Sequence, residues 1–363
     1  MIAVKTVFIL GAGASYDAGV PLMAGFLDKA DRLTRGLNDA AAIDVFTAIS
    51  ELQGVYAKAH LDLDNIEALF GAIEMAGLIG RLANRSPESI TGLRASLINL
   101  IVHTIEQSSF FPVSKEGGQT AAKPYPEFIE MLKLVSETVQ SEERMQFAFL
   151  TFNYDVVLDH ALTTYGVAYS YYLDPNEPHD RIPVLKLHGS INWGVCPECK
   201  TTVPYPISQA RIRPIRSDTR NVVFNIGTNI HLKEHEQCRK PLLGPPVLVP
   251  PTWNKNSYHG DLQRVWNHAA KELATANNIF VIGYSLPESD SFFRYLFALG
   301  SESKTRIKRL WIFNPDRDGT VEQRFRRMVG RGIESRLEFF KGESGLFSES
   351  ISEIQRALLS EFR

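Results

Sequence analysis

Three polar side chains that could carry out chemistry stand directly after hydrophobic segments of this chain. Asn153 and Asp155 close the segment FLTFNYD, and His188 lies in LKLHGS. An amide both donates and accepts hydrogen bonds, so Asn153 can hold a hydroxyl group and a water molecule at once. A histidine, whose ordinary pKa is about 6.5, is suited to accept a proton near neutral pH. Asp155 is suited to orient a ligand or the histidine.

Each of these residues also has an ordinary structural interpretation. An asparagine at a strand end often caps the next helix, and DVVLDHAL after Asn153 is typical of a helix start. A lone histidine after a strand is more often structural than catalytic. Together, however, these residues end buried segments that are typical of parallel strands. Because open α/β sheets bind ligands at the carboxyl ends of their strands, we interpret Asn153, Asp155 and His188 as candidate catalytic residues.

Two further hydrophobic segments, VFILGAGAS and FVIGYSL, end in glycine turns. Glycine permits close approach of a backbone to a phosphate, and the N-terminus of a following helix favours an anion. The usual dinucleotide fingerprint is incomplete, because Tyr16 stands at the third glycine position and no acidic residue follows about twenty positions on. For the first turn alone, a purely structural role is equally compatible. The candidate nucleotide-binding residues in these turns are Gly11, Ala12, Gly13, Ser15, Gly283 and Ser285.

Three cysteines and a histidine have the spacing of a zinc site. Cys196 and Cys199 form C-P-E-C, and His235 and Cys238 form H-E-Q-C with the same spacing. Two such knuckles joined by a loop can place four nitrogen and sulfur ligands around tetrahedral zinc. Three reduced cysteines in a polar loop are the alternative. Other candidates for the fourth ligand are His231, Glu234 and Glu236.

Alternating strand and helix patterns predict an α/β fold with a Rossmann-like parallel sheet covered on both faces. Residues 37–144 instead carry apolar residues at helical spacing with few strand signals, which predicts a helical insertion. The predicted parts are a core in three segments (1–36, 145–193 and 246–363), the helical insertion (37–144) and a small zinc-ribbon-like module (194–245).

The insertion segment NIEALFGAIEMAGLIGRLA is apolar over much of a helix circumference, which favours burial on more than one side. Contacts with another subunit or a partner that regulate access to the site are one interpretation. A self-contained helical subdomain with its own core is the other. Asn65 and Glu67 are candidates to face the cleft if NIEALF begins a helix over it.

Composition and charge argue against a nucleic-acid-binding, membrane-spanning or disulfide-rich secreted protein. The 363 residues carry a net charge of −2, so the chain lacks the excess of positive charge that is typical of proteins that bind nucleic acid or an anionic membrane. The basic cluster RIRPIRSDTR is interpreted as a solvated loop, with a phosphate or partner contact as the alternative. No apolar run reaches the roughly 18 residues of a membrane helix. The apolar stretch Val7–Leu10 is shorter than the roughly 7 residues of a secretory signal core, and three cysteines are too few for a disulfide scaffold. We therefore expect a cytoplasmic protein.

Several of these motifs resemble those of the sirtuin family. GAGASYDAGVP is similar to the sirtuin signature, in which a Gly-Ala-Gly turn and a serine lead to Gly-Ile-Pro. TFNYD resembles Gln-Asn-Ile-Asp, with Asn153 and Asp155 at the matching places. KLHGS resembles the Leu-His-Gly-Ser block, which implies that His188 matches the family's catalytic histidine.

Two later segments extend this resemblance in the same order. GYSL is similar to the Gly-Thr-Ser turn near the cofactor ribose and phosphates, at Gly283 and Ser285. IFNPD resembles the Ile-Asn segment that contacts the adenosine, which implies a cofactor contact for Asn314. The resemblance covers about two thirds of the chain. It implies NAD as the substrate, bound inverted relative to the usual Rossmann mode, and a structural zinc ribbon.

The chain also departs from the pattern of sirtuin deacylases. No arginine follows GVP, and Phe152 replaces the glutamine before the asparagine. Pro250 and Pro251 stand where that family binds its peptide as an added strand, and proline cannot donate ladder hydrogen bonds. These departures favour a resemblance to the divergent sirtuin-like domains of bacterial antiviral defence, which implies an NAD hydrolase (NADase) that releases nicotinamide and ADP-ribose.

Two other functions stay open from the sequence. One is NAD-dependent protein deacylation or ADP-ribosyl transfer, and the other is a non-enzymatic module that senses NAD or ADP-ribose. Because a freely active NADase would harm its host, we expect gating by a homo-oligomer or by a companion defence protein, an ATPase being one candidate. No membrane and no direct nucleic-acid partner is expected.

Overall fold

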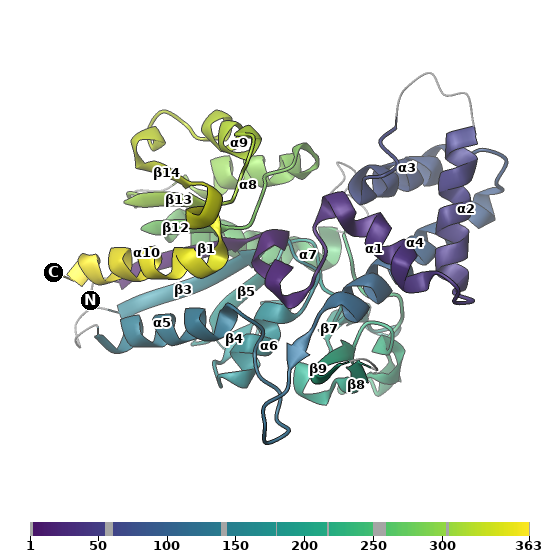
Figure 1. Ribbon diagram of the computed structural model, residues 1–363, viewed down its shortest axis with the longest axis horizontal. Coiled ribbons are helices and arrows are strands. Elements are labelled where there is room, and N and C mark those ends of the chain that lie inside the picture. Colours follow the sequence, from purple (N-terminus) through teal and green to yellow (C-terminus); the bar gives the residue numbers. More distant parts are fainter. Residues whose placement is uncertain are drawn as a thin grey trace. The chain divides into compact units, whose positions relative to one another are not determined.

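The computed structural model describes residues 3–54, 61–138, 144–178, 180–215, 218–249, 259–302 and 305–362 (Figure 1). The chain forms two compact units. The first comprises Met1–Ala18, Phe111–Leu187 and Gly260–Arg363, and the second comprises Gly19–Phe110 and His188–His259. The predicted division into five segments stays a prediction.

A seven-stranded sheet forms the centre of the first unit. Its strands are β1 (Ala3–Leu10), β3 (Arg144–Thr151), β4 (Tyr169–Ser170), β5 (Ile182–Lys186), β12 (Asn278–Ile282), β13 (Arg309–Phe313) and β14 (Leu337–Phe340). They lie in the order β14-β13-β12-β1-β3-β5-β4, and every pairing is parallel. The predicted parallel α/β sheet is therefore confirmed.

The strands are continuous apolar segments because the sheet is buried on both faces. Every residue of β12 is buried, and Phe8 of β1 is fully buried. Helices α5 (Tyr125–Thr138) and α10 (Phe347–Leu359) contact one another. The ring of Phe128 in α5 lies edge-on to Phe8, with centroids 5.1 Å apart, and also contacts Phe347 of α10 at 5.1 Å. Through Phe128, this aromatic packing joins α5 directly to β1 and joins α10 to α5.

The chain reverses its direction of travel through the sheet beside β1, which pairs with β3 on one side and β12 on the other. Such a topological switch point is where open α/β sheets form a ligand crevice. Helix α7 (His259–Thr275) precedes β12, and the other helical segments follow strands of this unit: 3-10 helices η1 (Ala12–Ala18) and η5 (Glu288–Asp290), and helices α6 (Val157–Thr164), α8 (Ser291–Gly300) and α9 (Thr320–Met328). Short elements complete it: β2 (Phe111–Pro112), η6 (Glu334–Arg336), η7 (Gly342–Gly345) and η8 (Ser360–Phe362).

The second unit contains a helical part: η2 (Met23–Gly25), α1 (Phe26–Thr34), α2 (Ala40–Gly54), α3 (Ile66–Ile79) and α4 (Pro87–Ser108). Helix α4 contacts α1, α2 and α3. Leu69, Phe70 and Ile73 of α3 are buried, so the helices have a core of their own, as one of the two interpretations of the insertion predicted. Asn65 caps α3 by accepting hydrogen bonds from the amides of Glu67 and Ala68. The predicted subunit contacts stay a prediction.

The rest of the second unit consists of small antiparallel hairpins: β6 (Trp193–Val195) with β7 (Thr202–Pro204), β8 (Arg211–Ile215) with β9 (Asp218–Asn225), and β10 (Glu234–His235) with β11 (Lys240–Pro241). They are accompanied by η3 (Ile207–Gln209) and η4 (Ile230–Leu232). Cys196, Ile230 and Leu242 form their small buried core. Arg211 and Arg213 of the basic cluster are exposed on β8, while part of that cluster (216–217) lies outside the described residues. No helix in the described ranges has both the length and the apolar character needed to span a membrane.

Candidate functional site

The predicted polar and glycine segments of the first unit gather at one edge of the sheet. Gly11 follows β1, Asn153 follows β3, Gly283 follows β12 and Asn314 follows β13, and these four strands are neighbours. Since all four strands are parallel, their carboxyl ends lie at the same edge, at the switch point. The structure therefore brings together the first-unit residues that the sequence singled out.

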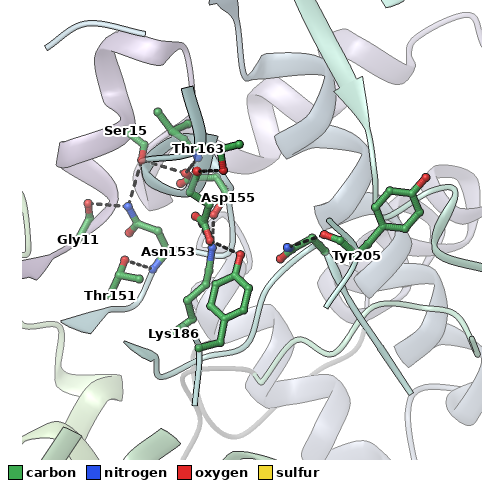
Figure 2. A network of polar contacts seen from close by, with 12 residues as sticks. Gly11, Ser15, Thr151, Asn153, Asp155, Thr163, Lys186 and Tyr205 are labelled. Carbon is green, nitrogen blue, oxygen red and sulfur yellow. Dashed lines mark hydrogen bonds and ion pairs between the residues drawn. The ribbon is translucent and has the colours of Figure 1, made fainter. Parts of the chain in front are cut away.

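Asn153 is held by both hydrogens of its side-chain amide (Figure 2). Its Nδ2 donates to the carbonyl oxygen of Gly11 at 2.9 Å and to Ser15 Oγ at 3.2 Å. A carbonyl oxygen can only accept, so this contact fixes which end of the amide is nitrogen. Among the residues that the structure describes, none donates to Oδ1 of this half-buried side chain. Asn153 therefore presents a hydrogen-bond acceptor at the edge of the sheet.

Asp155 is turned into the protein. Its Oδ1 accepts hydrogen bonds from Ser15 Oγ at 3.1 Å and from the amide of Val157 at 2.9 Å, at the start of α6. Burial raises the pKa of Asp155, against the effect of nearby Lys186 and of these donors. Ser15 Oγ thus links Asp155 to Asn153, and the predicted catalytic role of Asp155 stays a prediction. Ser15 is 1% exposed, and its predicted contact with a nucleotide stays a prediction.

The two glycine turns pack directly against each other. The amide of Gly13 donates to the carbonyl of Gly283 at 2.9 Å, and that of Gly11 donates to Ile282 at 3.0 Å. A Cβ atom on Gly13 would lie 2.7 Å from Gly283 Cα, which is too close for any side chain. The close approach of the backbones that follow β1 and β12 is thus sufficient to explain why glycines occupy these positions. The expected helix N-terminus that favours a phosphate is only a seven-residue 3-10 helix, with the amide of Ala14 already bonded to Gly11.

An aromatic pair that sequence reasoning missed joins the same turns. Phe152 and Tyr284 stack with centroids 4.2 Å apart and an interplanar angle of 8°. Phe293 lies edge-on to Phe152 at 5.2 Å, and the buried Asp290 accepts the Tyr284 hydroxyl at 2.8 Å. A Cβ atom on Gly11 would lie 2.5 Å from Tyr284 Cα, so the bare end of β1 leaves room for the pair. Both aromatic residues occupy positions at which the sirtuin pattern has a glutamine and a threonine.

Asn314 and Ser285 lie at the ends of the next two strands. Asn314 donates from Nδ2 to the carbonyl of Tyr284 at 3.4 Å and accepts from the amide of Asp316 at 3.1 Å. It thereby connects the ends of β12 and β13. Ser285 is exposed, and Arg324 of α9 donates to its carbonyl oxygen at 3.4 Å. Their predicted contacts with a cofactor stay predictions.

His188 belongs to the second unit, although it follows β5 by two residues. It is 3% exposed, and its carbonyl accepts the amide of Val249 at 2.8 Å. The next residue, Gly189, has a φ of +81°, and a Cβ atom there would lie 2.1 Å from the carbonyl oxygen of Val247. The glycine of the HGS block is therefore required by the close approach of residues 247–249.

The second unit also contains the predicted metal ligands. Cys196, Cys199, His235 and Cys238 form one cluster in which the ligand atoms lie within 4.8 Å of one another. A tetrahedral zinc ion with bonds of about 2.3 Å to sulfur separates its ligand atoms by about 3.8 Å, so the cluster fits zinc. Hydrogen bonds from Thr201 lower the pKa of Cys199 to about 6, whereas burial and the neighbouring cysteines raise the pKa of Cys238 to about 11. The four predicted residues thus come together as a group that can hold structural zinc.

The two knuckles have matching backbones. The amide of Lys200 donates to the carbonyl of Cys196 at 3.0 Å, and that of Arg239 donates to His235 at 2.7 Å, four residues apart in both cases. Lys200 and Arg239 also share a left-handed conformation, with φ of 60° and 50°. His235 therefore occupies the place in its knuckle that Cys196 has in the other. The alternatives His231, Glu234 and Glu236 are not part of the cluster found among the described residues.

Comparison with known proteins gives structural similarity alone. No family model matches the chain, and no curated protein matches it. Solved structures of Sir2 homologues are similar to it. A complex of an S24A mutant of a Sir2 homologue with ADP-ribose matches at 14% identity and a TM-score of 0.43, over 98% of this chain and 92% of that one. A Sir2 homologue in complex with NAD matches at 14% identity and a TM-score of 0.43, over 99% and 91%. A structure from work on the structural basis for the mechanism and regulation of Sir2 enzymes matches at 15% identity and a TM-score of 0.41. The match covers 98% of this chain and 93% of that one. At these scores the similarity by itself assigns no activity to this chain.

Proposed function

We propose that this protein hydrolyses NAD at the bond between nicotinamide and ribose. The bond from C1 of the ribose to the nicotinamide nitrogen breaks, and its electron pair leaves with neutral nicotinamide. The oxygen of a water molecule bonds to C1, and one water proton is released. The products are nicotinamide, ADP-ribose and a proton. As the bond breaks, C1 of the ribose becomes an oxocarbenium-like centre. Catalysis at such a centre depends more on a fixed position of the ribose and of the attacking water than on a strong acid.

One observation supports this activity most: the way Asn153 is held at the switch point. The side-chain amide donates both of its hydrogens, to Gly11 and to Ser15. No residue that the structure describes donates to Oδ1, which therefore remains an acceptor for a ligand. An acceptor fixed by Gly11 and Ser15, which both follow β1, can bind a ribose hydroxyl or the attacking water without reorganising. The resemblance of TFNYD to the sirtuin asparagine segment supports the same role.

His188 is the proposed proton acceptor. The imidazole takes a proton from the water or from a ribose hydroxyl as the new bond forms. The support is its place two residues after β5, in a block that matches the sirtuin histidine segment. Its backbone is fixed by Val249 and by the tight turn at Gly189.

Hydrolysis is favoured over deacylation by the departures from the deacylase pattern. The aromatic stack of Phe152 and Tyr284 replaces polar positions of that pattern at the same edge. The two prolines at the expected peptide strand, Pro250 and Pro251, lie outside the described residues. We further propose a gated effector of bacterial antiviral defence that depletes NAD, with a homo-oligomer or a companion protein controlling it.

Nicotinamide release from NAD tests this function. Purified full-length protein is incubated with NAD, with and without an acyl-lysine peptide, and with and without the products of its neighbouring genes. Peptide-independent release of equal amounts of nicotinamide and ADP-ribose is expected. Release that requires the peptide would show deacylation or transfer. Tight NAD binding without turnover under all these conditions would contradict the hydrolase and favour a sensing module.

A further inference from the structure

A buried lysine lies at the end of β5, next to the turn that carries Asn153. Lys186 has a side chain that is 1% exposed, and its Nζ contacts Asp159 Oδ2 at 3.1 Å. Nζ also donates to the carbonyl oxygen of Asp155 (Figure 2). A lysine is almost never buried so fully without a partner, because desolvating an ammonium group is costly. Here one ammonium group links a side chain of α6 with the backbone of the turn.

Asp159 is fully engaged as the partner of this lysine. Its side chain is 1% exposed, and its second oxygen, Oδ1, accepts the hydroxyl of Tyr171 at 2.5 Å. Burial next to this carboxylate raises the pKa of Tyr171 well above its ordinary value, so the hydroxyl keeps its proton and remains a donor. The position of the ammonium group is therefore fixed by Asp159, which is itself held by the Tyr171 hydroxyl.

The turn between Asn153 and Asp155 is held from three directions. Strand β1 and the following turn hold the Asn153 amide through Gly11 and Ser15. The start of α6 holds the Asp155 carboxylate through the Val157 amide. Lys186 holds the Asp155 carbonyl from the side of β5. Removing Lys186 would release the third contact and leave two buried carboxylates, Asp155 and Asp159, without their cation.

We infer that Lys186 is a positioning residue that fixes the direction of the Asn153 amide through the Asp155 carbonyl. This inference rests on the proposed function. Lys186 does not contact the substrate; it keeps Oδ1 of Asn153 aimed at the ribose or the water. A displacement of about 1 Å in such a group lowers a reaction rate about 100-fold.

The test removes both charges of the Lys186–Asp159 ion pair and leaves the Asp155 carboxylate in place. The double variant Lys186→Met/Asp159→Asn keeps similar volumes, and the asparagine still accepts the Tyr171 hydroxyl. We expect a folded protein whose Kd for NAD changes less than about 3-fold, whereas kcat for nicotinamide release falls about 100-fold. Wild-type kcat in this variant would overturn the inference.

A second ion pair of the same unit provides a matched control. Lys5 of β1 contacts Glu272 of α7 at 2.7 Å, with side-chain exposures of 17% and 8%. The double variant Lys5→Met/Glu272→Gln also removes a largely buried pair, but away from the turn that carries Asn153. Its kcat is expected to stay within about 3-fold of the wild type. An equal loss of kcat in both double variants would show general destabilisation and contradict a positioning role.

Hydrogen exchange separates this inference from the proposed function. The amide of Val157 is protected by Asp155 Oδ1, so a loosened turn exposes it. Faster exchange at Val157 in the Lys186→Met/Asp159→Asn variant, but not in the Lys5→Met/Glu272→Gln variant, is expected whether or not NAD is cleaved. Absence of NAD cleavage by the wild type, with and without the products of its neighbouring genes, would refute the function while this readout still tests the turn. Unchanged exchange at Val157 would overturn the role of Lys186.

Discussion

Asp159 of the first unit and Glu106 of the second unit are both 1% exposed, but different groups meet the two carboxylates. Asp159 faces the ammonium group of Lys186. Glu106, on α4, accepts the amides of Ile226 at 2.6 Å and Gly227 at 2.5 Å, the more distant amide of Thr228 at 3.3 Å, and the Thr228 hydroxyl at 2.8 Å. Among the residues with described positions, a full charge balances the carboxylate of Asp159, whereas dipoles balance that of Glu106.

This difference has consequences for how each unit responds to pH. Burial raises the pKa of Glu106 to about 7, against the effect of its four donors, so it changes charge near neutral pH. The turn it holds lies between β9 and η4, whose Ile230 packs with Cys196 in the small core of the hairpins. The junction of α4 with the hairpins that carry the candidate zinc ligands is therefore expected to respond to mild acidification. The ion pair of Lys186 and Asp159 provides a fixed contact beside Asn153.

The largest difference between the units is expected on metal removal. We predict about one zinc ion per chain, bound by Cys196, Cys199, His235 and Cys238. Structural zinc contributes roughly 10 kcal/mol or more to the folding of small modules, so chelation should unfold the hairpins of the second unit and leave the sheet of the first intact. Elemental analysis and hydrogen exchange with and without chelator measure this. Equal loss of protection in both units, or absence of zinc in protein prepared without chelator, would contradict the prediction.

Substitution of one candidate catalytic residue in each unit comes next. Asn153→Ala and His188→Ala are each expected to abolish NAD cleavage, with a loss of about 1,000-fold or more, because each removes a group proposed to act on the reacting atoms. Circular dichroism should show an unchanged fold. Nicotinamide release by chromatography is the measurement. Full activity in either purified variant would remove that residue from the mechanism.

The substitution Glu106→Gln tests whether the Glu106 carboxylate changes charge near neutral pH. A group whose pKa is raised on folding stabilises the protein below its ordinary pKa of 4.5, and that contribution is lost as the pH rises through about 7. The free energy of unfolding of the wild type, relative to the glutamine variant, should therefore fall by about 3 kcal/mol between these pH values. Urea unfolding at several pH values measures the difference. A difference that does not change with pH would show that Glu106 keeps one charge state throughout.

The smallest effect is expected at the aromatic pair. Tyr284→Phe keeps the stack on Phe152 but removes the hydroxyl that Asp290 accepts. Loss of this hydrogen bond to a buried carboxylate should lower the free energy of unfolding by about 2 kcal/mol. Thermal unfolding reports this change, and Tyr295→Phe, at a tyrosine that is 63% exposed, is the control. A loss no larger than in the control would show that the hydroxyl contributes nothing to stability.

Much of the first unit could be predicted because its signals are local. A parallel strand buried on both faces is a run of apolar residues, as in NIFVI, and its end is marked by the first polar residue or glycine. The two zinc knuckles were also visible from spacing alone, because each is a turn of four residues. Apolar residues around the circumference of α3 predicted burial on several sides, but the buried Leu69, Phe70 and Ile73 share one face of the helix, and Leu78 and Ile79 are exposed.

Other features depend on partners distant in sequence. Lys186 and Asp159 are 27 residues apart, and Glu106 lies 120 residues from Ile226. A lysine at a strand end or a glutamate on a helix is usually solvated, so neither residue type indicates burial. Phe152 was visible as a departure from the sirtuin pattern, but its stacking on Tyr284 was not. Their stacking depends on β1 lying between β3 and β12 with a glycine at its end.

The sequence by itself determined where strands end, which polar groups follow them and that three cysteines with a nearby fourth ligand can bind a metal, whereas the structure selected His235 as that ligand. These properties depend on hydrophobicity and spacing over a few residues. Only the tertiary structure decided which strand ends are neighbours, that Asn153 is held by Gly11 and Ser15, and that His188 belongs to the second unit. The physical reason is that apolar periodicity reports that a residue is buried, whereas the partner it meets is set by strand order and long-range packing.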